Sequence, residues 1–131
     1  MIIKTPIYTV YLLHFDQPVG KAQHYCGVCK AHRLHWRMME HRNGRGAALT
    51  AEAYRQGIGF TVVREWLSDT TELEQEIKRK SFFKRHCWIC SPAVEKPPSR
   101  LTERHYSAVA PHLPFKALDA VSAPRTSRYR P

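Results

Sequence analysis

Two short segments decide the fold of this chain: Thr9-Val10-Tyr11-Leu12-Leu13 and, after a turn, His24-Tyr25-Cys26-Gly27. Residues 7–15 are rich in β-branched and aromatic side chains, which is typical of a strand. Pro18 and Gly20 then favour a turn, and residues 22–28 form a second strand that returns antiparallel. Because side chains alternate between the two faces of a strand, this hairpin can bring Tyr11 and Tyr25 together on one face.

Helical patterns follow the hairpin. Residues 30–42 place apolar side chains at helical spacing, and Arg33, Arg37 and His41 occupy one neighbouring stripe. We further predict a short helix over residues 50–56, a strand over 58–66, and a helix that runs to about residue 80. The resulting fold class is α+β (α/β in the broad sense), a three-stranded antiparallel sheet flanked by helices in the order β-β-α-α-β-α.

The chain changes character after Cys90. Most of its nine prolines lie there, and the pattern predicts a folded domain over residues 1–90 and a disordered, basic, Pro-rich tail over 91–131. Within the tail only residues 101–112 show weak helical character. No apolar run is long enough to span a membrane and the N-terminus does not resemble a secretion signal, so we expect a cytoplasmic protein, with association with the nucleoid as an extension of that expectation.

The formal charge of +10 comes from 21 Lys and Arg against 11 Asp and Glu. A surplus of this size favours polyanionic partners, because neutralising phosphates releases condensed counterions. Solubility alone is the simpler explanation. Charge therefore indicates a class of partner and no mechanism.

Several side chains match the needs of phosphodiester hydrolysis. The reaction requires a deprotonated water, neutralisation of phosphate charge and a stabilised leaving oxygen. An arginine fork fits phosphate oxygens, and a carboxylate can hold a divalent ion. A tyrosine hydroxyl can position or deprotonate water when cations lower its pKa. The candidates for these roles are Tyr11, Tyr25, Arg37, His41 and Glu74.

These motifs resemble the GIY-YIG nuclease superfamily. Val10-Tyr11-Leu12-Leu13 is similar to its first motif and Tyr25-Cys26-Gly27 to its second; Arg37 to His41 is similar to its helical Arg-x-x-x-His stretch, and Leu73 to Lys78 to its metal-binding glutamate helix. The likeness covers about residues 7–80 and is greatest to small single-domain members with a Gly-Arg-Gly-Ala turn, here 44–47. The chain departs from the family pattern at two places. Its first motif reads Thr9-Val10-Tyr11 where Gly-Ile-Tyr is usual, and Cys26 replaces the isoleucine of the second motif.

The resemblance implies a metal-dependent endonuclease that hydrolyses phosphodiester bonds in DNA. It implies that Glu74 holds Mg²⁺ or Mn²⁺ and that one of the two tyrosines activates the water. We expect the nearby cations Arg33, Arg42, Arg45 and Lys78 to contact the nucleic acid. A lone domain of this size is also expected to select its target through a protein partner or as a homodimer.

Each candidate has a simpler explanation. Both tyrosines could be ordinary strand aromatics, and His41 could be a helix C-terminal residue favoured by the dipole. Arg33 competes with Arg37 for the phosphate role. Glu74 competes with two neighbours, but Glu72 is explained by capping and Glu76 by a pair with Lys80.

Four cysteines form two Cys-x-x-Cys pairs, Cys26/Cys29 and Cys87/Cys90, which could supply a Cys₄ zinc site. An extended strand would separate Cys26 from Cys29, whereas residues 85–90 are better placed to bind a metal together with a histidine. We favour unlinked reduced thiols over zinc at Cys87 and Cys90.

Two further function classes stay open beside the nuclease. A non-catalytic nucleic-acid-binding module would bind DNA in a salt-sensitive way without cutting it. A zinc-stabilised interaction protein would contain stoichiometric zinc and unfold on chelation.

Overall fold

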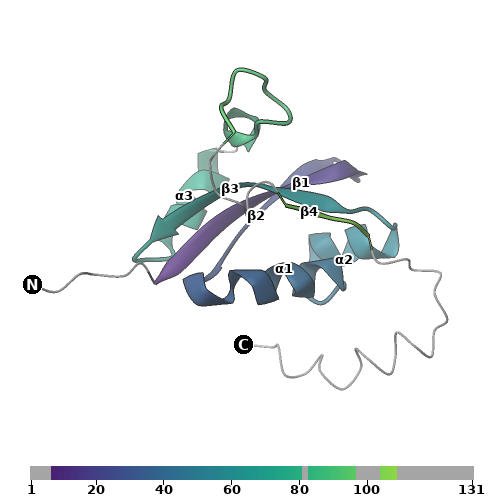
Figure 1. The fold of residues 1–131 in the computed structure, drawn as a ribbon, viewed down its shortest axis with the longest axis horizontal. Helices are drawn as coiled ribbons and strands as arrows, with labels where there is room; N and C mark the ends of the chain where they lie inside the picture. The colour runs from purple at the N-terminus through teal and green to yellow at the C-terminus, as the bar shows by residue number, and fades with distance from the viewer. Residues whose placement is uncertain (1–6, 81–82, 97–103, 109–131) are drawn as a thin grey trace, which may run out of the picture.

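The computed structural model of the chain describes residues 7–80, 83–96 and 104–108 (Figure 1). The elements are β1 (Tyr8–Val19), β2 (Ala22–Lys30), the 3₁₀ turn η1 (Ala31–Arg33), α1 (Leu34–Arg42), α2 (Ala48–Arg55), β3 (Phe60–Ser68), α3 (Glu72–Lys80), the 3₁₀ turn η2 (Phe83–His86) and β4 (His105–Tyr106). The α+β class is confirmed. The sheet gains one strand over the three that were predicted.

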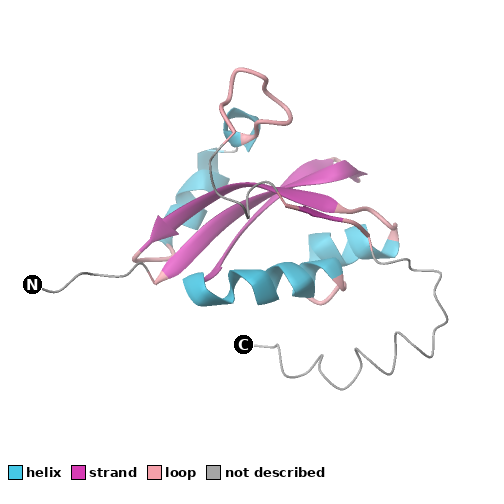
Figure 2. Ribbon diagram, viewed as in Figure 1, coloured by secondary structure: helices cyan, strands magenta, loops and turns pink. Residues whose placement is uncertain are grey.

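The sheet is antiparallel throughout its described pairs, in the order β2-β1-β3-β4 (Figure 2). The fourth strand lies in the segment that was predicted to be a tail. Tyr106 of β4 is buried in the core and stacks on Phe60, with ring centroids 5.1 Å apart. The described residues 104–108 are therefore extended against the sheet and not helical, because Tyr106 finds an apolar partner there. The rest of the segment 101–112 lies outside the described residues. The predicted domain boundary at residue 90 stays a prediction.

The hairpin is longer and tighter than expected. β1 continues to Val19, and the turn consists of Gly20 and Lys21, with Gly20 at a φ of 63° in the left-handed region that glycine favours. Pro18 fits within β1 because β3 pairs with β1 only as far as Phe15. The missing proline N–H therefore has no ladder partner to lose on that side.

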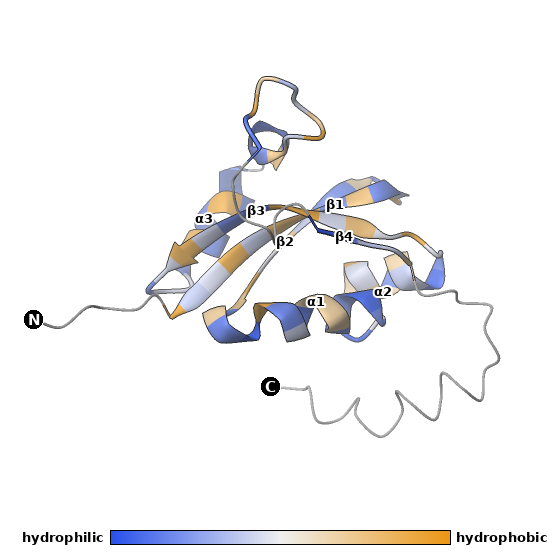
Figure 3. Ribbon diagram, viewed as in Figure 1, coloured by the Kyte–Doolittle hydropathy of each residue, from blue (hydrophilic) through white to orange (hydrophobic). Residues whose placement is uncertain are grey.

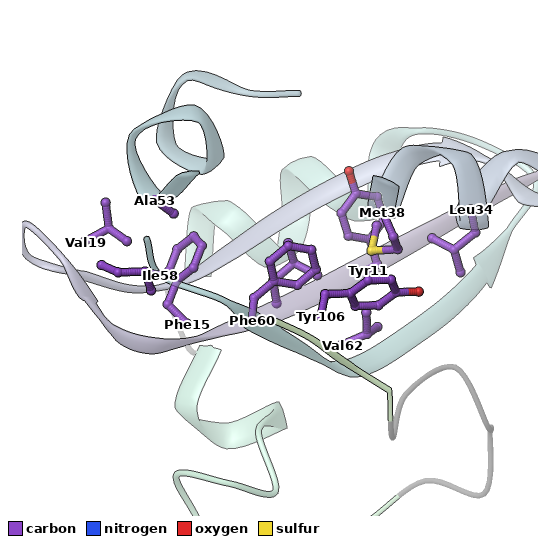
Figure 4. Packing of buried hydrophobic residues seen from close by; sticks show 11 residues of the cluster. Tyr11, Phe15, Val19, Leu34, Met38, Ala53, Ile58, Phe60, Val62 and Tyr106 are labelled. Atoms are coloured by element: carbon purple, nitrogen blue, oxygen red, sulfur yellow. The ribbon is translucent and has the colours of Figure 1, made fainter. Parts of the chain in front are cut away.

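Helices cover both faces of the sheet (Figure 1). On one face α1 and α2 enclose an apolar cluster in which Tyr11, Phe15 and Met38 are fully buried (Figure 4). On the other face α3 and η2 pack over a second cluster that includes Leu12, Val63 and Ile77. Apolar residues accordingly recur along all of the long strands (Figure 3). From β1, Tyr11, Leu13, Phe15 and Val19 face α1 and α2, whereas its even-numbered residues 10 to 14 face α3 and η2.

Among the described residues, no helix combines the length and the apolar character that a membrane crossing needs.

Candidate active site

Tyr11 lies at the centre of a hydrogen-bonded group between the sheet and α1. Its side chain is fully buried. Its hydroxyl lies 2.6 Å from His41 Nε2 and accepts a longer hydrogen bond from Arg37 Nε at 3.4 Å. Arg37 and His41 are one turn apart on α1, so the predicted i, i+4 pair does converge on the first predicted tyrosine.

The hydrogen-bond partners of His41 favour one tautomer, which we assign from them. Thr50, at the start of α2, donates its hydroxyl proton to the Ala47 carbonyl at 3.1 Å, so it accepts from His41 Nδ1 at 2.8 Å. With its proton on Nδ1, His41 accepts at Nε2. Tyr11 is therefore the donor in the 2.6 Å hydrogen bond, and its oxygen is left to accept from Arg37.

The guanidinium of Arg37 is held from a second side. Nη1 donates to Glu40 Oε1 at 2.9 Å, and the Arg37 side chain is still 28% exposed. The pair with Glu40 and the hydrogen bond to Tyr11 raise the pKa of Arg37 although burial opposes this. A fixed, charged fork with an exposed edge is suited to binding a phosphate.

Tyr25 lies beside this group on β2 and is half-buried. Its ring centroid is 6.3 Å from that of Tyr11 and 5.2 Å from that of His41. Lys78 of α3 lies over the ring, with Nζ 5.8 Å from the centroid. Both predicted tyrosines therefore share one face of the sheet, but Tyr25 is the more accessible.

Glu74 reaches the same region from α3, which packs against β2. It is buried, its Oε2 forms an ion pair with Lys78 Nζ at 2.8 Å, and its charge opposes ionisation of Tyr25. The competing Glu76 forms the predicted pair with Lys80, at 3.4 Å, on an exposed surface. Of these two carboxylates, Glu74 is the one that acts on Tyr25.

Burial dominates the protonation states of the site. It raises the pKa of both tyrosines above 10, although Arg37 acts in the opposite direction on each and Lys78 on Tyr25. Burial, with Arg37 beside it, lowers the pKa of His41 to about 3. In the resting protein the two phenols are protonated and His41 is neutral.

Glycines make room for these side chains. Gly27 pairs with Tyr11 in the β1–β2 register, and a Cβ at this position would lie 2.5 Å from the Tyr11 hydroxyl oxygen and 2.9 Å from Tyr25 Cε2. At Gly46 a Cβ would collide with the imidazole of His41. The glycine of the Tyr25-Cys26-Gly27 motif thus has a steric reason in this fold.

We expect Gly27→Ala to displace both tyrosines and to cost about 1–3 kcal/mol of unfolding free energy, as overpacking of a core does. Urea denaturation measures this cost. In a Tyr11→Ala background the same substitution should cost less, because its nearest neighbours, the Tyr11 hydroxyl and Cζ, are then absent. An equal cost in both backgrounds would contradict the steric explanation.

The lowered pKa of His41 predicts a pH dependence of stability. The pKa of His41 is near 6.5 in the unfolded chain and about 3 in the folded chain. The contribution of His41 to the free energy of unfolding is therefore fully present above pH 6.5 and is lost as the pH falls toward 3. His41 should account for a loss of about 2 kcal/mol between roughly pH 7 and pH 5. Denaturation at a series of pH values should show a shallower dependence in His41→Gln than in the parent chain; identical slopes would refute this.

The predicted nucleic-acid contacts differ in their availability. Arg33 is exposed, and Lys78 is exposed while it pairs with Glu74. Arg42 donates from Nε to the Ser107 carbonyl at 2.9 Å, which ties α1 to the end of β4, and the Nε of Arg45 is buried. Arg33 and Lys78 are thus better placed for a nucleic acid than Arg42 and Arg45.

A second group of chemically active side chains lies on the opposite face of the sheet. Its members, whose ligand atoms all lie within 4.8 Å of one another and could hold a metal ion, are His14, His24, Cys87 and Cys90. Cys26 packs in the cluster beneath α3, whereas Cys29 packs against the cluster beneath α1. The Cys₄ alternative therefore fails for the predicted reason, that an extended strand separates the pair.

The sequence pattern indicates Cys87 and Cys90 as the better placed metal-binding pair, but it does not point to His14 or His24 as their partners. The nearby His86 does not join them and packs edge-on against Trp66, with centroids 5.1 Å apart. His14 and His24 are directly paired across β1 and β2. The register of the β1–β2 hairpin would have predicted that His14 and His24 lie together, but the sequence pattern does not give this register.

No family model, curated protein or solved structure matches the chain.

Proposed function

We propose that this domain is a metal-dependent endonuclease that hydrolyses phosphodiester bonds in DNA. The observation that carries the proposal is the convergence of Tyr11, Arg37 and His41 in one hydrogen-bonded group, with Tyr25 packed against it. On the side of Tyr25, Lys78 of α3 lies over the ring and is paired with Glu74. The resemblance to GIY-YIG nucleases and the charge of +10 support the same reading.

The surroundings of the two tyrosines favour different roles for them. The Tyr11 hydroxyl is buried and donates to His41 while accepting from Arg37, so it positions the arginine. Tyr25 is partly exposed and lies under Lys78. We assign to Tyr25 the contact with the attacking water, because it is the more accessible tyrosine and because Lys78 and Arg37 offset part of the rise in pKa that burial causes.

Arg37 has the geometry to hold the scissile phosphate. Glu40 and Tyr11 fix its orientation, and its exposed edge remains for phosphate oxygens. Charge that develops on those oxygens during hydrolysis is then offset by a group that needs no reorganisation. His41 acts through Tyr11 and Thr50 as a neutral positioning residue.

The donors at Glu74 fit a hard divalent cation. Mg²⁺ is commonly held by one or two carboxylates, with water and substrate phosphate completing its shell, so the single carboxylate of Glu74 suffices. Lys78 pairs with the same Glu74 carboxylate through Oε2, and its side chain is 40% exposed on the side from which DNA would approach in this proposal. A bound Mg²⁺ or Mn²⁺ would supply Lewis-acid stabilisation of the phosphate and of the leaving oxygen.

The purified full chain should nick supercoiled plasmid in the presence of Mg²⁺ or Mn²⁺ and should stop on addition of EDTA. Tyr25→Phe should remove most of this activity. Metal-independent cutting that persists at the same rate in Tyr25→Phe would identify a contaminating nuclease and refute the proposal.

A non-catalytic DNA-binding module is the second candidate, favoured by the exposed cations Arg33 and Lys78. It predicts binding that weakens steeply with salt and leaves the plasmid intact at every metal concentration. Binding and nicking measured on the same preparation separate the two functions.

A further inference from the structure

The His14, His24, Cys87 and Cys90 group joins two distant parts of the chain. His14 and His24 stand opposite each other on β1 and β2, with ring centroids 5.2 Å apart in an edge-to-face arrangement. Both cysteines come from the turn that follows η2. This turn lies beyond α3, on the sheet face opposite to Tyr11 (Figure 1).

Four close approaches link the ligand atoms. His14 Nδ1 lies 3.4 Å from His24 Nε2, 3.5 Å from Cys87 Sγ and 3.4 Å from Cys90 Sγ. The fourth, between Cys90 Sγ and His24 Nε2, is 3.5 Å. The atoms therefore surround one point.

These separations match the edges of a zinc tetrahedron. Zinc binds thiolate sulfur at about 2.3 Å and imidazole nitrogen at about 2.0–2.1 Å. Four such ligands at tetrahedral angles would place nitrogen and sulfur about 3.5 Å apart and two nitrogens about 3.4 Å apart. The chain holds the ligand atoms at these separations.

Hydrogen bonding explains the group less well. The 3.4 Å between His14 Nδ1 and His24 Nε2 is longer than the roughly 2.7–3.2 Å of ordinary hydrogen bonds from N–H groups. His14 Nδ1 also faces three partners at once, whereas a neutral imidazole nitrogen either donates one proton or accepts one. Lone pairs that converge on one point are the arrangement that a cation requires.

The local backbone supports thiolate ligands. Cys87 and Cys90 lie on a tight turn, and the Cys90 N–H donates to Cys87 Sγ at 3.4 Å. Such a donor stabilises the negative sulfur that binds metal. Two sulfurs and two imidazoles in a tetrahedron select zinc over magnesium, which prefers oxygen ligands.

We infer that this chain binds one structural Zn²⁺ through His14, His24, Cys87 and Cys90. All four positions are filled by protein, which distinguishes a structural site from a catalytic one. The ion would join the β1–β2 hairpin to the segment that follows α3 and so hold η2 against the sheet. This site is separate from the proposed Mg²⁺ position at Glu74.

Metal analysis of the full chain, purified under reducing conditions without chelator, should find about one zinc per chain. Replacement by Co²⁺ should give the visible absorption of a tetrahedral cobalt thiolate. Removal of the ion by a strong chelator should lower the melting temperature, and added Zn²⁺ should restore it.

The matched variants are Cys90→Ala and His86→Ala, which change neighbouring positions inside and outside the ligand set. Cys90→Ala should lose stoichiometric zinc and the cobalt thiolate spectrum; His86→Ala should keep both. If Cys90→Ala fails to fold, the cobalt spectrum and chelator titration of the parent chain still decide. Two results would contradict the proposed zinc site. One is a parent chain that contains no zinc and whose melting temperature changes with neither chelator nor Zn²⁺; the other is a stoichiometric metal other than zinc. Because none of these measurements depends on DNA cleavage, they test the zinc site independently of the nuclease proposal.

Discussion

Glu74→Gln is expected to reduce metal-dependent DNA cleavage by about 10²–10³-fold, the scale on which removal of one electrostatic stabiliser acts. The amide keeps the size of the side chain but removes the charge that would hold Mg²⁺. Plasmid nicking at saturating Mg²⁺ measures the effect, and circular dichroism shows whether the domain is still folded.

The chain supplies a matched control for this substitution. Glu76 lies on the same helix and forms the same i, i+4 pair with a lysine, but it is 51% exposed, whereas Glu74 is 11% exposed beside Lys78. Glu76→Gln should leave cleavage within a few-fold of the parent chain. Equal activity in the two variants would remove Glu74 from the proposed metal site.

Arg37→Lys is expected to lower cleavage by about 10²-fold while DNA binding changes little. Lysine keeps the positive charge, so the counterion release that drives binding is preserved. It cannot, however, make the forked contact to phosphate, and the two hydrogen bonds that fix the guanidinium, to Tyr11 and Glu40, are lost. Single-turnover cleavage and fluorescence binding separate the two effects.

Arg33→Lys is the control for this prediction, because Arg33 was the alternative candidate and is exposed just before α1. It should leave the single-turnover rate nearly unchanged. A larger rate loss in Arg33→Lys than in Arg37→Lys would reverse the assignment of the phosphate contact.

The α+β fold and its order of elements could be predicted from local patterns, since strand and helix periods, turn residues and caps act over a few positions. Tyr11, Arg37 and His41 were also predicted to act together, because i, i+4 spacing on a helix fixes the relation between two of them. The short β4 could not be predicted in this way. Two residues carry too little pattern, and what places Tyr106 is its stacking on Phe60, a contact between distant parts of the chain.

The register of the β1–β2 hairpin was the second feature that local sequence patterns could not predict. Val19 pairs with Ala22 beside the turn, whereas His14 pairs with His24, and the ladder shifts between these positions. A regular hairpin extended from the turn would not place the two histidines opposite each other. The metal-binding group thus depended on an irregularity of the strand that composition and spacing do not reveal.

The alternation of β1 has a consequence for how this chain tolerates insertions and deletions. Tyr11 faces α1 and His14 faces η2, and both are positioned by the same pairing with β2, opposite Gly27 and His24. Moving one strand by a single residue turns every side chain to the other face. One added or lost residue between the tyrosine and the histidine of β1 would therefore disassemble at least one of the two groups, so the spacing of this strand is constrained from both sides of the sheet.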